Sequence, residues 1–264
     1  MPLIASEFIW HDYTTLANGL RIPRSHVHPL LEQLELACQA GSLEEVQRIL
    51  PQITPVPADI PGKALVSLQG SIRAAVEQKH HDVVRAMLQS GFLPYNLSCL
   101  AVDAAFHGGD TAMLKLFIEA GWDVNEAGPQ MIMRPLLRHA VNLPDLRAFL
   151  LAHGASPNTE NQRRLTPLET AVQWSGTDVV RDLLDHGGDP AKDDSLVAAA
   201  EVGNIDVADL LVSRGADVNA LEKELPHPWG QRERRTALEV ALERNHQDMA
   251  VWLRRHGATA RNNT

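Results

Sequence analysis

One pattern constrains the fold of this chain more than any other, because the same short ending closes six segments. They read AMLQSGF, LFIEAGW, FLLAHGA, DLLDHGG, LLVSRGA and WLRRHGA, with glycines at positions 91, 121, 154, 187, 215 and 257. The intervals between these glycines are 30, 33, 33, 28 and 42 residues. Recurrence at such a spacing indicates a repeat protein, in which each unit buries its apolar face only by stacking on its neighbours.

Each unit is predicted to hold two short helices joined by a turn. The closing glycine supplies the left-handed residue that ends the second helix. Thr166 and Thr236 are expected to cap first helices, and Pro167 takes a first helical position, where its missing N–H costs nothing. Small residues recur within the first helices and let neighbouring helices approach closely: Ala75, Ala105, Ala171, Ala199 and Ala241.

The openings and endings of several units carry family motifs. TPLETA begins at Thr166 and TALEVA at Thr236, while GWDVN begins at Gly121 and GADVNA at Gly215. By these motifs the chain resembles the ankyrin-repeat family over residues 34–258. The resemblance implies an all-α solenoid of about seven helix-turn-helix units. It also implies that the fingers and first helices form a surface that binds other macromolecules.

The repeats do not extend to the N-terminus. We expect a non-repeat segment at residues 1–33 and a repeat domain at residues 34–264, with the second unit starting near Ser71. The first segment contains several aromatic and aliphatic residues, so it is expected to pack over the first units as a cap. Residues 51–62 are rich in proline and are predicted to be an extended connection.

Two intervals depart strongly from the 33-residue spacing. The interval from Gly187 to Gly215 is five residues short, so the loop after Gly187 has almost no finger. The interval from Gly215 to Gly257 is nine residues long, and the excess falls in EKELPHPWGQRERR, residues 222–235. We interpret residues 222–235 as an enlarged finger before the last unit.

One slot that holds a histidine in the family is occupied by other polar residues: Arg73, Asp103, Glu169 and Glu239. The histidine of the family hydrogen-bonds between neighbouring units. One interpretation is a substitute polar network, in which Arg73 and Asp103 of adjacent units pair. The other is a row of acid–base groups.

Charge and composition exclude some classes of function. The formal net charge is −9, which disfavours binding of nucleic acids and of anionic membranes. Two cysteines cannot build a disulfide framework, and no apolar stretch approaches the length of a membrane span or a signal peptide. We therefore expect an intracellular protein in the cytoplasm, with the nucleus as the alternative.

The twelve histidines have structural explanations. Three directly precede repeat glycines, where a side-chain donor meets the free carbonyls of a helix end: His153, His186 and His256. His80 and His81 are expected to be solvated at a turn. His26 and His28 lack a third ligand, and the chain contains no common nucleotide, hydrolase or metalloprotease motif, so we predict no metal and no cofactor.

Arginine gathers on the predicted fingers of this acidic chain, and Trp229 lies near the tip of the long one. These residues are typical of binding hot spots, and the alternative is a solvated loop whose arginines are balanced by nearby glutamates. Phe92 and Trp122 follow the closing glycines of consecutive units, so they form either an exposed contact patch or a covered one. The predicted contact residues are Arg134, Arg163, Arg164, Trp229, Arg232, Arg234, Arg235, Trp122 and Phe92.

Two functions from different classes remain open. The first is a protein-interaction module or scaffold that grips an acidic segment of a partner protein on its finger face. The second is an enzyme or small-molecule binder, whose pocket the N-terminal segment and the long finger would close. In that case Trp229 and His227 would line the pocket and Glu239 would act as a base. A deep, enclosed and mostly apolar pocket would favour the second hypothesis.

Overall fold

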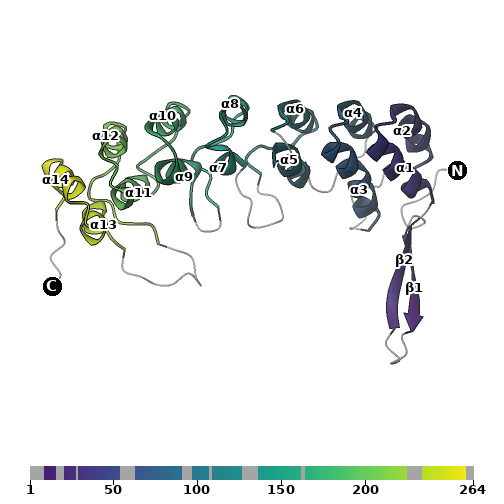
Figure 1. The fold of residues 1–264 in the computed structure, drawn as a ribbon, viewed down its shortest axis with the longest axis horizontal. Coiled ribbons are helices and arrows are strands. Elements are labelled where there is room, and N and C mark those ends of the chain that lie inside the picture. Colours follow the sequence, from purple (N-terminus) through teal and green to yellow (C-terminus); the bar gives the residue numbers. More distant parts are fainter. Residues whose placement is uncertain are drawn as a thin grey trace. The chain divides into compact units, whose positions relative to one another are not determined.

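Helix pairs follow one another along the whole chain in the computed structural model (Figure 1). The structure describes residues 9–15, 21–27, 29–53, 63–90, 97–106, 109–126, 136–161, 164–224 and 234–259. Seven helix pairs lie within these ranges, which confirms the predicted all-α repeat fold. The chain divides into two bodies, residues 1–123 with repeats one to three and residues 124–264 with repeats four to seven.

The first body contains three helix pairs and a short 3-10 turn. Its helices are α1 (Pro29–Ala40), α2 (Leu43–Ile49), α3 (Lys63–Glu77), α4 (His81–Gln89), α5 (Leu97–Phe106) and α6 (Thr111–Glu119), and η2 (Leu50–Gln52) follows α2. First helices stack on first helices, since α3 contacts both α1 and α5, and α4 likewise contacts α2 and α6.

The second body contains four helix pairs arranged in the same way. Its helices are α7 (Leu136–Ala140), α8 (Pro144–Ala152), α9 (Pro167–Trp174), α10 (Thr177–Asp185), α11 (Ser195–Val202), α12 (Ile205–Ser213), α13 (Ala237–Glu243) and α14 (Gln247–Arg255). Helices α7, α9, α11 and α13 form one row, and the connecting loops between repeats leave on that side (Figure 1).

The N-terminal segment adds a feature that the sequence analysis did not predict. Strands β1 (Ile9–Thr15) and β2 (Arg21–Val27) pair antiparallel, with Ile9 opposite Val27 and Thr15 opposite Arg21. Strand β1 is rich in β-branched and aromatic residues, which favour extended backbone. The structure describes only their backbone, so the proposed capping of the first units stays a prediction.

Two helices of the first body begin earlier than predicted. Helix α1 starts at Pro29, before the expected domain boundary at residue 34. Helix α3 starts at Lys63, so placing the start of the second unit near Ser71 was wrong. The stretch KALVSLQG before Ser71 contains good helix formers, and a single glycine within it does not outweigh them.

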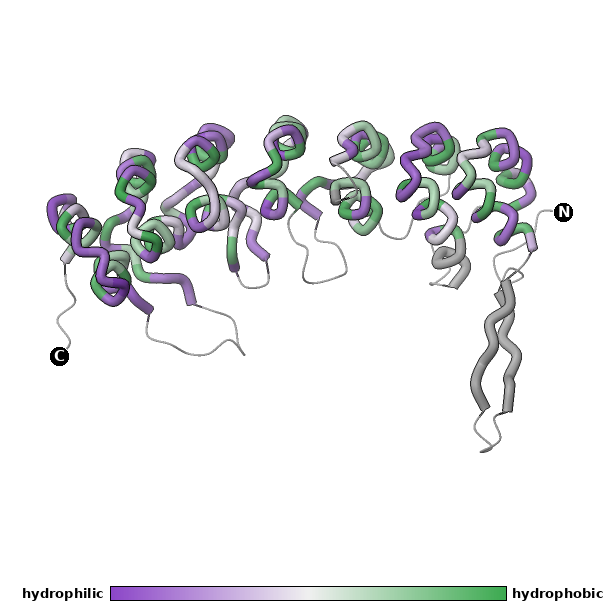
Figure 2. Tube along the Cα trace, in the orientation of Figure 1, coloured by the Kyte–Doolittle hydropathy of each residue, from purple (hydrophilic) through white to green (hydrophobic). Residues whose placement is uncertain are grey.

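The core of each body is built from small residues on the first helices and aliphatic pairs on the second. The five alanines predicted to line the helix contacts are all buried, as are Leu183, Leu184, Leu210 and Leu211. Burial of each leucine contributes on the order of 1.5–3 kcal/mol. The helices of the second body alternate between hydrophobic and hydrophilic residues along the chain, as amphipathic helices do (Figure 2).

An asparagine side chain joins consecutive repeats of the second body at three places. Each stands four residues after a closing glycine and donates from its amide to the carbonyl of the next closing glycine: Asn125 to Gly154 at 2.9 Å, Asn158 to Gly187 at 2.8 Å and Asn219 to Gly257 at 3.1 Å. The same side chains accept from a backbone N–H just beyond that glycine, at 2.8–3.0 Å. These bonds satisfy groups that the helix ends leave open.

The closing glycines have the predicted backbone. Gly121, Gly154, Gly187, Gly215 and Gly257 have φ between +87° and +100°, which confirms the left-handed residue after the second helices α6, α8, α10, α12 and α14. The histidines that precede three of these glycines contact carbonyl groups at the helix end, as predicted. The Nδ1 atoms of His153, His186 and His256 lie 2.8, 2.8 and 2.9 Å from the carbonyl oxygen four residues earlier.

Histidines at the turns between paired helices contact the neighbouring repeat. His80 Nε2 lies 3.2 Å from the carbonyl oxygen of Gln39, and His81 Nε2 lies 2.9 Å from Asp110 Oδ2. Both residues lie at the predicted turn and are partly exposed, as expected, and these contacts between repeats were not predicted. His246 repeats the arrangement in the second body, with Nε2 3.0 Å from the carbonyl oxygen of Glu201.

The substitution Gly203→Ala should destabilise the second body more than Gly187→Ala. Both glycines have positive φ, at +73° and +91°, so both substitutions strain the backbone. A Cβ atom at position 203 would also lie 2.8 Å from His246 Nδ1, whereas nothing lies within 4 Å of one at position 187. Urea denaturation should show the larger loss for Gly203→Ala, by roughly 1 kcal/mol or more.

The variant His246→Ala supplies the control. In that background the excess cost of Gly203→Ala over Gly187→Ala should disappear, because the ring that blocks the Cβ atom is gone. Equal costs for the two glycine substitutions in the wild-type background would show that the histidine does not pack against the turn as described.

Candidate functional site

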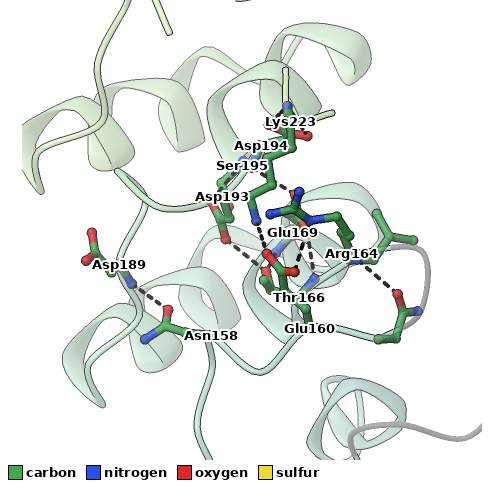
Figure 3. Close-up of polar contacts among 12 residues, drawn as sticks. Asn158, Glu160, Arg164, Thr166, Glu169, Asp189, Asp193, Asp194, Ser195 and Lys223 are labelled. Carbon is green, nitrogen blue, oxygen red and sulfur yellow. Dashed lines mark hydrogen bonds and ion pairs between the residues drawn. The ribbon is translucent and has the colours of Figure 1, made fainter. Parts of the chain in front are cut away.

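The bases of the fingers in repeats five, six and seven meet at a polar pocket in the second body (Figure 3). Its walls come from α9, from α11 and from the finger residues Arg164, Glu222 and Lys223. The pocket is open to solvent and has a volume of about 100 Å³. Binding pockets for small molecules usually have volumes of about 300 Å³ or more, so this one suits side chains rather than a whole metabolite.

Glu169 is the buried centre of this polar site. It begins α9 in a capping box with Thr166, whose side chain accepts from the Glu169 N–H at 3.0 Å. Glu169 Oε2 accepts from the Thr166 N–H at 2.6 Å, and Oε1 accepts from the Asp194 N–H at 2.8 Å. The carboxylate therefore ties the start of α9 to the start of α11 in the next repeat.

Two aspartates on the short loop before α11 complete this link. Asp193 Oδ2 accepts from the Thr166 hydroxyl at 2.8 Å, and Asp193 Oδ1 accepts from the Ser195 N–H at 3.0 Å. Burial raises the pKa values of Asp193 and Asp194 above the usual range of aspartate. Burial, and next the charge of Asp193, raise the pKa of Glu169 to about 7.

Cations from two fingers close the opposite side of the site. The Lys223 N–H donates to Asp194 Oδ1 at 2.9 Å, and Lys223 Nζ donates to Glu160 Oε1 at 2.7 Å. Arg164 Nε donates to the second oxygen of Glu160 at 3.2 Å. Burial alone would raise the pKa of Glu160, but the hydrogen bonds from Lys223 and Arg164 outweigh it and lower the pKa.

A buried ion pair fixes the base of the long finger. Leu221 and Thr236 form an antiparallel bridge, and the Glu222 N–H donates to the Arg235 carbonyl at 2.9 Å. Arg235 donates to Glu222 Oε1 at 2.8 Å and to Glu222 Oε2 at 3.0 Å, and it reaches Glu243 at 2.5 Å. Glu222 is buried, and Arg235 supplies the opposite charge beside it.

The described finger arginines have partners within the chain. Arg164 pairs with Glu160, and Arg234 donates to the carbonyls of Leu221 and Glu222. Arg235 pairs with Glu222 and with Glu243 of α13. These contacts favour the alternative of arginines balanced by nearby glutamates for Arg164 and Arg235, and the predicted role in partner binding stays a prediction.

Other predicted residues divide into three groups. Trp122 is buried, so of the two alternatives for it the covered one holds and the exposed contact patch does not. Glu239 caps α13 in a box with Thr236, accepting from the Thr236 N–H at 2.7 Å, so its carboxylate is held by the backbone rather than poised as a base. Outside the described residues lie Phe92, Arg134, Arg163, His227, Trp229 and Arg232.

The substitute polar network predicted for the histidine slot is confirmed for the one pair that was named in advance, Arg73 and Asp103. Arg73 Nε lies 3.0 Å from Asp103 Oδ2, across repeats two and three. Glu169 extends the network between repeats five and six through the backbone of Asp194. These contacts favour the network over a row of acid–base groups.

Trp174 is the residue that sequence reasoning missed. It ends α9 and is 73% exposed, although tryptophan is mostly buried in folded proteins. A signal was available, because the buried Leu168, Ala171 and Val172 already supply the apolar face of this short helix and Trp174 is its last residue. Trp174 directly follows the pocket residue Gln173 in the sequence.

Within the described ranges, no group of three or more histidine, cysteine, aspartate or glutamate side chains is arranged to hold a metal ion. None of the helices in those ranges combines the length and apolar character needed to cross a membrane.

Comparison with known proteins places these repeats in a family. A family model described as ankyrin repeats in three copies matches residues 136–222, which span α7 to α12 and the carboxylate site. The chain is also similar to an ankyrin repeat protein of Fowlpox virus (strain NVSL), with 28% identity over 156 residues. That alignment covers 53% of this chain and 34% of the viral protein, so this chain spans about a third of its relative.

The substitution Glu169→Gln should remove part of the pH dependence of stability. The carboxyl has a pKa of about 7 in the folded chain and about 4.5 without its surroundings, so the folded chain binds this proton more tightly. The free energy of unfolding should therefore rise as the pH falls through that window, and the rise should be smaller in Glu169→Gln. Urea denaturation at about pH 7.5 and about pH 5 measures both.

The matched control is Glu44→Gln, an exposed residue of α2, which should keep the wild-type pH dependence. Glu169→Gln should also be less stable at every pH, because an amide oxygen replaces only one of the two acceptors. A pH dependence that is identical in wild type and Glu169→Gln would contradict the raised pKa of Glu169.

Proposed function

The chain belongs to the ankyrin-repeat family, and on this basis we propose that it is a protein-interaction module or scaffold. It binds a partner protein on the fingers and first helices of repeats five to seven. The observation that carries this proposal is the exposure of Trp174 on a first helix, directly after the pocket residue Gln173. An aromatic side chain of this size in solvent is typical of a contact surface.

The long finger is the second part of the proposed contact surface. Its ends are pinned by the Leu221–Thr236 bridge and by the Glu222–Arg235 pair, so an interaction loop is presented from a fixed base. A fixed base limits the entropy that is lost when the loop binds. Trp229 and Arg232 would supply the contacts at its tip.

The prediction that the partner presents an acidic segment now depends on fewer arginines. Arg164, Arg234 and Arg235 have partners within the chain, as described above. An acidic partner would therefore have to be recognised by Arg134, Arg163 and Arg232, which lie outside the described residues. This preference stays a prediction from the sequence.

An enzyme or small-molecule binder is the less favoured alternative. The described pocket is small and open, and Glu239 is engaged by the backbone of Thr236. We also propose an intracellular location, in the cytoplasm with the nucleus as the alternative. Cys38 and Cys99 form no disulfide with each other, in keeping with a reducing compartment.

Replacing residues 225–233 with a Gly-Ser-Gly linker should abolish capture of the partner while leaving the fold intact. The described residues that pin the finger, Leu221, Glu222, Arg235 and Thr236, are all retained. The measurement is affinity capture from cells that naturally express the chain, followed by identification of bound proteins and by circular dichroism of the variant.

The control is the double substitution Leu36→Ala and Glu44→Gln, which alters exposed residues of the first body and should retain capture. If the linker variant captures the same proteins at the same level as wild type, the finger does not belong to the contact surface. If wild type captures a metabolite and no protein, the proposed function itself is wrong.

A further inference from the structure

Trp174 does not stand alone on its surface. Val202 occupies the equivalent place in the next repeat, since each residue stands two positions before the N-cap of the following second helix, Gly176 or Asn204. Helices α9 and α11 pack against each other, so these two side chains lie at the same end of neighbouring helices. Val202 is 43% exposed, which extends the apolar surface that Trp174 begins.

The polar pocket includes the residues that precede these two apolar side chains. Gln173 and Glu201, the residues directly before Trp174 and Val202, both line it. We call the surface formed by these four residues and by Asp194 the α9–α11 groove. Of these residues Gln173, Glu201 and Asp194 line the pocket, and Trp174 and Val202 follow Gln173 and Glu201 directly in the sequence.

The charge of the groove is negative. Four carboxylates line the described pocket, from Glu169, Asp194, Glu201 and Glu222, against two cations, Arg164 and Lys223. Both cations pair with Glu160, while Glu222 pairs with Arg235 and Glu201 pairs with Arg244. The excess of negative charge in the lining therefore comes from Glu169 and Asp194, which accept hydrogen bonds from backbone N–H groups. A positively charged ligand therefore complements this surface, and a negatively charged one does not.

Among the pocket carboxylates, Glu201 is the nearest in sequence to the exposed apolar residues, because it directly precedes Val202. One of its oxygens accepts from Arg244 of repeat seven. A carboxylate has two oxygens and about four lone pairs, so it can accept from a second donor as well. Its side chain is 35% exposed, which leaves it within reach of a ligand.

We propose that the α9–α11 groove binds a basic segment of a partner protein, with an arginine or lysine side chain stacked on Trp174 and hydrogen-bonded to Glu201. Tryptophan is the aromatic side chain that attracts cations most strongly, and a carboxylate beside it fixes the direction of the ammonium or guanidinium group. Val202 receives the aliphatic stem of the same side chain. This inference rests on the proposed function and names the chemistry of the partner at that surface.

The test is selection of a phage-displayed random peptide library against the full chain. Selected peptides should be enriched in arginine and lysine and depleted in aspartate and glutamate. Synthetic copies of the selected peptides should bind Trp174→Ala more weakly by at least about tenfold, which corresponds to the loss of a cation–π contact and its packing. Binding should also weaken in Glu201→Gln and at high salt.

Matched controls are Leu36→Ala, at another exposed apolar position, and Glu44→Gln, which removes an exposed carboxylate elsewhere. Both should keep wild-type affinity. Trp174 is mostly exposed, so Trp174→Ala should fold normally, and circular dichroism verifies this.

Three results would overturn the inference. They are selection of neutral or acidic peptides, equal binding of basic peptides by Trp174→Ala and wild type, and no enrichment of any peptide. The proposed function is judged separately, because affinity capture that is lost with the finger would still support a protein partner at another part of the surface.

Discussion

The second body depends on one contact that recurs along it, the hydrogen bonds between an asparagine side chain and the end of the next repeat. A helix that ends in a left-handed glycine leaves carbonyls without partners, and the asparagine amide satisfies one of them from the neighbouring repeat. The same side chain accepts a backbone N–H two residues further on, at Asp189 in the case of Asn158. Stacking of apolar faces supplies most of the stability, and these bonds fix the register in which the faces stack.

The carboxylate site arises where this contact is missing. Four residues after Gly187 the chain has Ala191 in place of asparagine, and the finger that would follow is almost absent. Thr166 and Glu169 join repeats five and six instead, through Asp193 and the backbone of Asp194. The short loop thus brings three carboxylates close to one another, and burial raises their pKa values. The next finger is long, and its Lys223 supplies a cation that the short one lacks.

The repeat period, the glycines and the threonine caps could be read from the sequence because each depends on neighbours within one repeat. The Arg73–Asp103 pair was also predictable, since equivalent slots in consecutive units lie side by side. The sequence did not allow us to predict which side chains turn toward a neighbouring repeat. Arg235 turns to a glutamate thirteen residues earlier, and Trp122 turns into the core, because burial depends on packing between repeats. Trp174 was missed because its exposure, unlike its identity, is a property of the assembled stack.

The first helices of repeats five and six present an acidic and partly apolar surface. The proposed function requires that a partner protein bind this surface. Hydrogen–deuterium exchange of the chain with and without its captured partner tests that claim most directly. Bound partner should slow exchange in residues 164–174 and 194–202, which carry α9, α11 and the pocket. Protection confined to the second helices α8, α10 and α12, with none in those two segments, would contradict it.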